Sequence, residues 1–375
     1  MSIVAFAALI GLLSWNPAES PRSEAKAALT VYCAAGLKPA VEPVAQEYER
    51  IFGVPIQVQY GGSGTLLSNL RVAGRGDLFI AADDSYMQLA RSNGLVAEII
   101  PLVHMVPVLA VRRGNPKNLH GLADLLQPGV TLVMANPEVA AIGKVVRDLL
   151  QKSGEWPALV RQIKVLKPTV NDVANDLKLG AADAGIVWDA TARQYPELEG
   201  IGLESFAAVE NTVPVGVLKW CPQPRSALRF ARYLGARDRG LRQFERTGYQ
   251  PVRGDAWAET PEVVLFSGGT NRVALEEALR RFEEREGARV TCDYNDCRVL
   301  VSRIKAGARP DACLACDVSV LRPMREDFDR VIEACGQSYA IHRRSDHPYL
   351  MERLLAALCP AESVGFGWRM GQPAR

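Results

Sequence analysis

The chain has 375 residues, of which 44 are basic and 42 acidic, so its formal net charge is only +2. A chain of this length is expected to divide into two or three domains instead of forming one core. The balanced charge argues against binding to nucleic acid or to an anionic membrane, and the composition, 48% hydrophobic, is typical of a globular α/β protein.

The N-terminus carries an apolar stretch at residues 3–13, followed by polar sequence and by Ala25-Lys26-Ala27. The stretch is too short to span a bilayer as a helix. The pattern predicts a secretory signal peptide over residues 1–27, with cleavage after Ala27. Because the usual basic residues before the apolar stretch are absent, a membrane-tethered N-terminus stays open as an alternative. In either case the protein is expected in the periplasm or another extracytoplasmic compartment.

Strands and helices alternate along the next part of the chain. The sequence predicts strands at 29–36, 55–60 and 77–83, with helices at about 37–52 and 64–74 between them. Such units need right-handed crossovers and predict a parallel sheet. Later strands are predicted near 107–116, 131–135, 183–190 and 213–220, and helices at 144–150, 170–180, 226–234 and 238–246.

These elements sort into two lobes, because the strand at 107–116 leaves the first unit and the strand at 213–220 returns to it. We predict a first lobe at about 28–108 and 212–258, with a second lobe at about 109–211 inserted into it.

A long segment of the chain occurs twice, because residues 31–87 match residues 265–321 without a gap. The shift is constant at 234 positions, so that Asp77, for example, corresponds to Asp311 (311 − 77 = 234). The apolar positions of the intervening helix coincide in both copies. After Leu321 the register resumes only loosely, with Ala340-Ile341 resembling Ala110-Val111, and residues 115–220 have no counterpart. Residues 259–375 are therefore predicted to form a single, degenerate copy of the first lobe.

Three loops built of small residues precede predicted helices: CAAG at 33–36, GGSG at 61–64 and NPEVAAIG at 136–143. In a parallel sheet, ligands bind beyond the carboxyl ends of the strands, where helix N-termini offer unpaired N–H groups. An oxyanion could be held there by backbone amides and the Ser63 hydroxyl. The alternative is that the glycines form a tight turn and Ser63 caps its own helix. In the second copy GGSG is replaced by NDCR at 295–298.

The segments 29–71, 76–87, 135–144 and 180–190, in this order, resemble the molybdate- and tungstate-binding proteins of bacterial ABC importers, within the class II periplasmic-binding superfamily. The resemblance covers about residues 29–255. It implies an α/β fold of two parallel-sheet lobes joined by a double-stranded hinge, which close on a tetrahedral oxyanion that is then passed to a membrane permease. To this fold the chain adds a third, single α/β lobe that repeats the first.

By position, the resemblance assigns the ligand-binding roles to Gly36, Ser63, Ala140 or Ala141, Val170 and Trp188. Two of them depart from the family. Gly36 stands where the family has a serine and has no hydroxyl, and Trp188 replaces a tyrosine with an indole that can only donate. A lost hydrogen bond to an anion costs about 1.5 to 3 kcal/mol, so the class of ligand is better supported than its identity. Lys38 could replace the missing hydroxyl or be an ordinary surface lysine.

The cysteines of the second copy suggest a further hypothesis. Cys313 and Cys316 have C-x-x-C spacing, but the repeat places them on a buried strand, which predicts core packing for Cys313 and not a redox role. Cys297 occupies the position of Ser63, and Cys316 falls at the end of the neighbouring strand. We therefore expect Cys297 and Cys316 to be near neighbours that can form a disulfide or bind a soft ion.

No catalytic or metal-ligand pattern emerges from the rest of the chain: the four histidines have no metal-ligand spacing, and Ser63 has no histidine partner. The sequence thus predicts an exported, non-enzymatic binding protein without a cofactor, with molybdate or tungstate as ligand and an ABC permease as partner. The alternative is a periplasmic sensory module for another small anion or organic acid that signals through the C-terminal lobe. An enzyme that uses the cysteine-rich lobe is less favoured.

Overall fold

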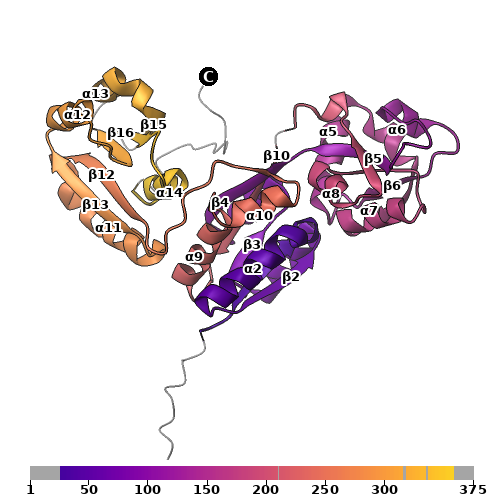
Figure 1. Ribbon diagram of the computed structural model, residues 1–375, viewed down its shortest axis with the longest axis horizontal. Helices are drawn as coiled ribbons and strands as arrows, with labels where there is room; N and C mark the ends of the chain where they lie inside the picture. The colour runs from indigo at the N-terminus through magenta and orange to yellow at the C-terminus, as the bar shows by residue number, and fades with distance from the viewer. Residues whose placement is uncertain (1–25, 210, 316–317, 335–336, 359–375) are drawn as a thin grey trace, which may run out of the picture.

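The computed structural model describes residues 26–209, 211–315, 318–334 and 337–358, so the predicted signal peptide lies almost entirely outside it. Three sheets with their helices form three lobes in a row, and the first lobe lies in the middle (Figure 1). Within the described ranges, no helix has the length and apolar character needed to cross a membrane.

The first lobe is built on a six-stranded sheet. Its elements are β1 (Leu29–Ala34), η1 (Ala35–Leu37), α2 (Lys38–Phe52), β2 (Ile56–Gly61), α3 (Ser63–Ala73), β3 (Leu78–Ile80), α4 (Asp84–Ser92), β4 (Val96–Met105), β10 (Asn211–Leu218), α9 (Pro224–Leu234), α10 (Gly240–Arg246) and β11 (Gln250–Pro251). The strand order is β11-β4-β10-β3-β1-β2.

The central strands of this sheet follow the prediction, and its edge differs from it. β1 pairs in parallel with β2 and with β3. The sheet then continues with antiparallel strands, because β10 pairs antiparallel with β3 and with β4. β4 and β11 were not predicted as strands. Helix α2 shows why the sequence folds as it does: its apolar stripe is buried on the sheet, and Gly53 ends it in the left-handed conformation with φ of 63°.

The second lobe is a five-stranded sheet in the order β7-β6-β8-β5-β9. Its elements are β5 (Pro107–Arg112), η2 (Leu122–Leu126), β6 (Leu132–Ala135), α5 (Ala141–Ser153), α6 (Trp156–Val160), β7 (Ile163–Lys167), α7 (Val170–Lys178), β8 (Ala184–Trp188), α8 (Asp189–Gln194), β9 (Leu198–Ile201) and η3 (Glu204–Phe206). The chain enters this lobe at Val106, directly after β4. It returns to the first lobe as β10.

The entry point is fixed by backbone and side-chain hydrogen bonds from α8. The Val106 amide donates to the Asp189 carboxylate at 3.1 Å, and the Asp189 amide donates to the Val106 carbonyl at 2.9 Å. Asp189 is buried, with 5% of its surface exposed. The first of the two connections between the lobes is therefore tied to Asp189 of the second lobe.

The third lobe repeats the first without the inserted second lobe. Its elements are β12 (Glu262–Gly268), η4 (Gly269–Asn271), α11 (Arg272–Glu286), β13 (Arg289–Asn295), α12 (Cys297–Lys305), β14 (Ala312–Ala315), α13 (Val318–Leu321), η5 (Arg322–Asp327), β15 (Phe328–Ala334), β16 (Gln337–His342) and α14 (Pro348–Leu358). Its strand order, β13-β12-β14-β16-β15, matches β2-β1-β3-β10-β4 of the first lobe.

Hydrogen bonds and element bounds repeat together with the strand order. The Asp77 carboxylate accepts from the Thr30 amide at 2.8 Å, and the Asp311 carboxylate accepts from the Val264 amide at 2.8 Å. The returning strand and helix correspond at a second shift of 124 positions, because α9 begins at Pro224 and α14 at Pro348 (348 − 224 = 124). β16 thus takes the place of β10. The sequence-based match of Ala340-Ile341 to Ala110-Val111 was wrong, since it compared β16 with a strand of the second lobe.

A buried cluster of charged side chains joins the third lobe to the first. Glu286, at the end of α11, accepts from Arg353 of α14 at 2.6 Å and from Arg232 of α9 at 3.2 Å. Burial alone would raise the pKa of Glu286, but Arg353 and Arg232 outweigh it and hold the pKa below its ordinary value. The Asp255 carboxylate, from the segment that connects the two lobes, accepts from two backbone amides at the start of α14.

Glu286→Gln should destabilise the protein strongly, because it removes the carboxylate that pairs directly with the two buried guanidinium groups of Arg232 and Arg353. Breaking a buried ion pair by removing one partner costs about 3 to 5 kcal/mol. We expect the midpoint of urea unfolding, followed by circular dichroism, to fall clearly.

The control is Glu284→Gln on the same helix, where an exposed carboxylate pairs with Arg280. Surface pairs contribute about 0 to 1 kcal/mol, so this midpoint should hardly move. Equal midpoints for the two variants would contradict the assigned role of Glu286.

Candidate functional site

A small cavity lies between the first and second lobes, where several helices begin. Its volume is about 20 Å³, and it is lined by Ala34, Ala35, Gly36, Gly61, Gly62, Ser63, Ala82, Ala140, Ala141, Ile142, Thr169, Val170 and Trp188. All six residues that the sequence analysis assigned to ligand binding are among them. Since a buried water needs about 10 to 15 Å³, this space suits one compact ion and not a sugar or an amino acid.

Ser63 presents a hydroxyl to the cavity. It is the first residue of α3 and is 1% exposed. Its Oγ accepts a hydrogen bond from the Ala82 amide at 3.1 Å, which leaves the hydroxyl proton free to be donated. Residue Gly62 is the N-cap of the helix and offers no side-chain acceptor. Ser63 therefore does not cap its own helix. The amide of Gly64 donates to the Val139 carbonyl at 2.9 Å, whereas the Ser63 amide has no acceptor among the residues that the structure describes.

The hydrogen bonds at the start of α5 distinguish between Ala140 and Ala141, the two candidates for the backbone donor. The Ala140 amide already donates to the Asn136 carbonyl at 2.9 Å. The Ala141 amide has no acceptor among the residues that the structure describes, and the N-cap of α5 provides no side-chain hydrogen bond. Ala141 is thus the available donor of this pair.

The start of α7 contributes Val170, although this helix is partly capped. Thr169 accepts from the Asp172 amide at 3.3 Å in a capping box. That bond satisfies the third amide of the helix and leaves the Val170 amide without an acceptor in the described part of the chain. The site thus combines amides from helix starts of both lobes, whose dipoles also favour an anion.

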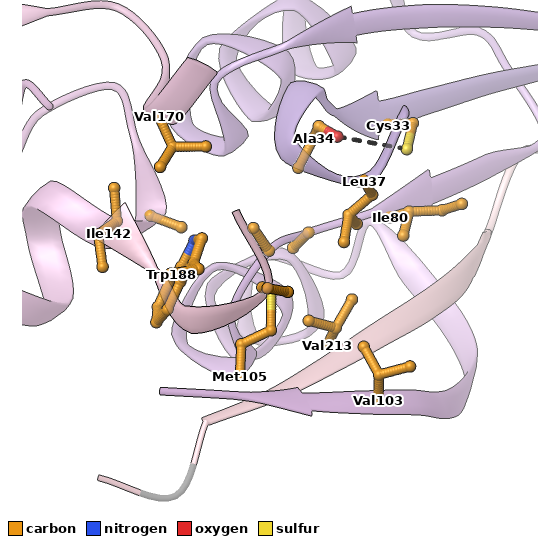
Figure 2. Packing of buried hydrophobic residues seen from close by; sticks show 14 of the residues in the cluster. Cys33, Ala34, Leu37, Ile80, Val103, Met105, Ile142, Val170, Trp188 and Val213 are labelled. Atoms are coloured by element: carbon orange, nitrogen blue, oxygen red, sulfur yellow. Dashed lines mark hydrogen bonds between the residues drawn. The ribbon is translucent and has the colours of Figure 1, made fainter. Parts of the chain in front are cut away.

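The two departures from the family have distinct structural consequences. A Cβ atom on Gly36 would lie 2.9 Å from Val170 Cγ1, so the Val170 side chain occupies the space that a serine would need. The Tyr249 hydroxyl donates to the Gly36 carbonyl and so holds this loop in place. Trp188 is 1% exposed, and the nitrogen of its indole lies at the end of the ring that faces Val170 (Figure 2).

No charged side chain lines the cavity. Lys38, which was considered as an electrostatic partner, lies on the surface and pairs with Glu42 at 3.8 Å. Asp83 follows the lining residue Ala82 but caps α4 by accepting from the Ser85 and Tyr86 amides. Burial raises the pKa of Asp83 to about 6. Any anion in the cavity would therefore be held by neutral donors alone.

The glycines of the GGSG loop let the second lobe touch the first. The Gly64 amide donates to the Val139 carbonyl across the cleft at 2.9 Å. A Cβ atom on Gly62 would lie 2.4 Å from the Val139 carbonyl oxygen and 2.9 Å from that of Pro168. The lobes are thus closed on each other. The sequence analysis expected these glycines to admit a ligand; the structure shows that they also admit the backbone of the opposite lobe.

One residue that supports the site was not predicted. Asn211 begins β10, the strand that returns from the second lobe, and its amide side chain donates to the Ala82 carbonyl at 2.9 Å. The amide of Ala82 in turn holds the Ser63 hydroxyl. Asn211 therefore positions Ser63 through one peptide group. No local pattern marks it, because 129 residues separate Asn211 from Ala82.

In the third lobe the corresponding corner is blocked by its own side chains. Asp296, which matches Gly62, caps α12 by accepting from the Arg298 amide at 2.8 Å. Asn271, which matches Leu37, hydrogen-bonds Ser267 and Gln337. A carboxylate thus occupies the helix start that is uncapped in the first lobe, which disfavours an anion there.

The cysteines of this corner are partly described. Cys313 is buried in β14, as predicted, and burial raises its pKa to about 12. Cys297 is the first residue of α12 and lines a cavity of about 10 Å³ together with Cys313. Cys316 lies outside the described residues, so the proximity of Cys297 and Cys316 stays a prediction. The described residues contain no cluster of His, Cys, Asp and Glu side chains that could hold a metal ion.

Comparison with known proteins assigns the chain to a family. Residues 29–250 match the family of bacterial extracellular solute-binding proteins, and the chain belongs to that family. Its first two lobes are therefore a solute-binding unit, as the resemblance in the sequence implied. The relatives are substrate-binding proteins and not enzymes.

Individual relatives are similar to the chain over most of their own length. The molybdate-binding protein ModA of Mycobacterium tuberculosis H37Rv is 28% identical over 254 residues, covering 66% of this chain and 95% of the relative. ModA of Escherichia coli K12 is 26% identical over 228 residues, covering 55% and 87%. The structure of the sulfate-binding protein SubI of M. tuberculosis has a TM-score of 0.53 at 19% identity, covering 60% of this chain and 88% of that one, and shows the shared fold.

Gly62→Ala should prevent the observed closure, because its Cβ atom would overlap two carbonyl oxygens of the second lobe. The expected result is a larger radius of gyration in small-angle X-ray scattering. Gly202→Ala is the matched control, since no heavy atom lies within 4 Å of a Cβ atom placed on Gly202. Closure through the GGSG loop would be refuted by identical scattering curves for the wild type and Gly62→Ala.

Proposed function

We propose that this protein captures a fully deprotonated tetrahedral oxyanion, with molybdate or tungstate preferred, and presents it to the permease of an ABC importer. The observation that carries the proposal is the cavity of about 20 Å³ at helix starts of two lobes, lined by the Ser63 hydroxyl and by free amides without any charged side chain. Helix starts bind such anions without a counter-charge.

The donor set favours an anion without a proton. Ser63 has already accepted a bond from Ala82, the Trp188 indole can only donate, and no carboxylate lines the cavity. Molybdate, tungstate and sulfate need only donors, whereas hydrogen phosphate must also donate its proton. Phosphate is therefore disfavoured. The choice among the remaining dianions depends on size, because they share charge and shape.

The relatives support the preference and the destination of the ligand. Two are named as molybdate-binding proteins and a further relative as an ABC transporter substrate-binding lipoprotein. A similar fold in a sulfate-binding protein keeps sulfate as the competing ligand. On this basis we assign the mature protein to the outside of the cytoplasmic membrane, with the predicted N-terminal signal directing export.

The sensory alternative uses the same cavity. It differs in the partner that would respond when the two lobes close on the ligand. The buried Glu286 cluster couples the third lobe to the first lobe, so a partner that binds the third lobe could report on the first. This coupling supports the sensory alternative, but it does not indicate which ligand a sensory protein would bind.

Ser63→Ala should weaken oxyanion binding about ten- to a hundredfold, because it removes one hydrogen bond to a charged group, worth about 1.5 to 3 kcal/mol. Isothermal titration calorimetry with molybdate, tungstate, sulfate and phosphate measures this. For the wild type we expect the first two anions to bind most tightly and phosphate most weakly.

The matched control is Ser68→Ala, an exposed serine on the same helix, which should leave every affinity unchanged. The proposal fails if the two variants bind alike, or if none of the four anions binds to the wild type.

A further inference from the structure

A second, larger cavity lies between the first and third lobes, outside the proposed oxyanion site. Its volume is about 430 Å³, which falls in the range of about 300 to 1,000 Å³ typical of small-molecule sites. The wall from the third lobe comes from α11 and α14, and the wall from the first lobe comes from α4 and β4. Figure 1 shows α14 lying between the two sheets.

The internal repeat explains why this space is open. In the first lobe, the groove between α2 and α9 is filled by aromatic rings: Tyr48 packs on Phe230 at 4.9 Å and on Tyr233 at 5.2 Å between ring centroids. In the third lobe the position of Tyr233 is Ala357, and that of Phe52 is Glu286. Two of the filling rings are therefore absent from the repeat, whereas Tyr48 corresponds to Phe282 and Phe230 to Leu354.

Two further positions carry smaller side chains in the repeat than in the first lobe. Val44 of the first lobe corresponds to Ala278, and Arg232 corresponds to Ala356. Ala278, Ala356 and Ala357 all line the cavity. Three larger side chains of one copy are thus alanines in the other, and every one of these alanines borders the same space.

The cavity is held open by bonds between the lobes. Glu286 joins Arg353 and Arg232 on one side, and Arg285 of α11 donates to Glu98 of β4 at 3.1 Å on the other. These bonds fix the two walls at a set separation. Closing the space would require breaking buried ion pairs, which is costly.

The charge of the lining selects a class of ligand. Phe282, Ile99, Tyr349 and the three alanines form apolar walls. Arg285 and Arg353 are paired with glutamates, whereas Arg91 has no carboxylate within ion-pair distance in the described part of the chain. Arg281 is exposed and pairs with Glu277 at 3.4 Å. A third glutamate, Glu352, also lines the cavity, so four arginines face three glutamates and the lining carries a net positive charge beside an apolar surface.

We propose that this cavity is a second ligand site, which takes a small organic anion with an apolar, ring-bearing body and a carboxylate or sulfonate group. The apolar body lies against Phe282 and the alanines, and the acidic group pairs with Arg91 and Arg281. Guanidinium groups bind such oxyanions with short, charge-assisted hydrogen bonds. The site is independent of the oxyanion cavity between the first and second lobes.

The test uses anilinonaphthalene sulfonate, a fluorescent probe with this chemistry, titrated into the full-length protein. We expect saturable binding of one probe per chain. Ala278→Trp fills the cavity and should weaken binding at least tenfold, whereas Ala274→Trp, an exposed alanine on the same helix, should not change it. Arg91→Ala should weaken binding about tenfold, and Arg71→Ala, in the last turn of α3, should leave it unchanged.

These outcomes test the second ligand site and not the proposed oxyanion site, because none of the substituted residues lines the oxyanion cavity. Molybdate titration of Ala278→Trp serves as the folding check and should match the wild type. Probe binding that is absent, or that is equal in Ala278→Trp and Ala274→Trp, overturns the proposal. Loss of binding in Ala278→Trp with no change in Arg91→Ala overturns the assigned charge of the ligand.

Discussion

Taking a dianion out of water requires that its lost hydration be replaced by fixed hydrogen-bond donors, and in the proposed function the first two lobes meet that requirement together. Two lobes each deliver helix starts to one point, so the donors come from the backbone and one hydroxyl. Positioning the donors needs no charged side chain, and none lines the cavity. The arrangement works only when the lobes touch, because each lobe holds only part of the donor set.

Contact between the lobes explains several small residues that would otherwise seem interchangeable. Gly62 and Gly64 bring the backbone of α3 against the carbonyls of Glu138, Val139 and Pro168. Asn211 and Asp189 sit at the two crossings between the lobes and bond to Ala82 and to Val106. Asn211 is therefore bonded directly to a residue that lines the site, and Asp189 follows the lining residue Trp188 in the chain.

The third lobe shows how the same fold loses the features that we propose hold an anion in the first lobe. Its strands follow the first lobe, but the helix start that faces the cavity in the first lobe is capped by Asp296 in the third. A capped helix start has satisfied its own amides and repels an anion. The repeat also lacks the second lobe that would supply the remaining donors. What it offers instead is an interface with the first lobe, fixed by Glu286.

Much of this could be predicted from the chain. Small-residue loops before helices pointed to Gly36, Ser63 and Ala141, because the chemistry of a helix start is local, and the family resemblance added Val170. The repeat predicted the third lobe, because a shared periodicity implies shared strands. Asn211 and Tyr249 could not be found, since they reach the site from distant strands and turns. The antiparallel strands β4 and β11 also escaped prediction, and Pro101 within β4 argued against a strand there.

The central claim is that uncapped helix starts of the first two lobes hold one oxyanion. A crystal structure of the tungstate complex tests it most directly, because anomalous scattering locates tungsten without ambiguity. The account predicts one tungsten position per chain, within hydrogen-bond reach through its oxygens of the Ser63 hydroxyl and the Ala141 and Val170 amides, and none beside Asp296. Tungsten bound elsewhere, or bound at the corner of the third lobe, would contradict it.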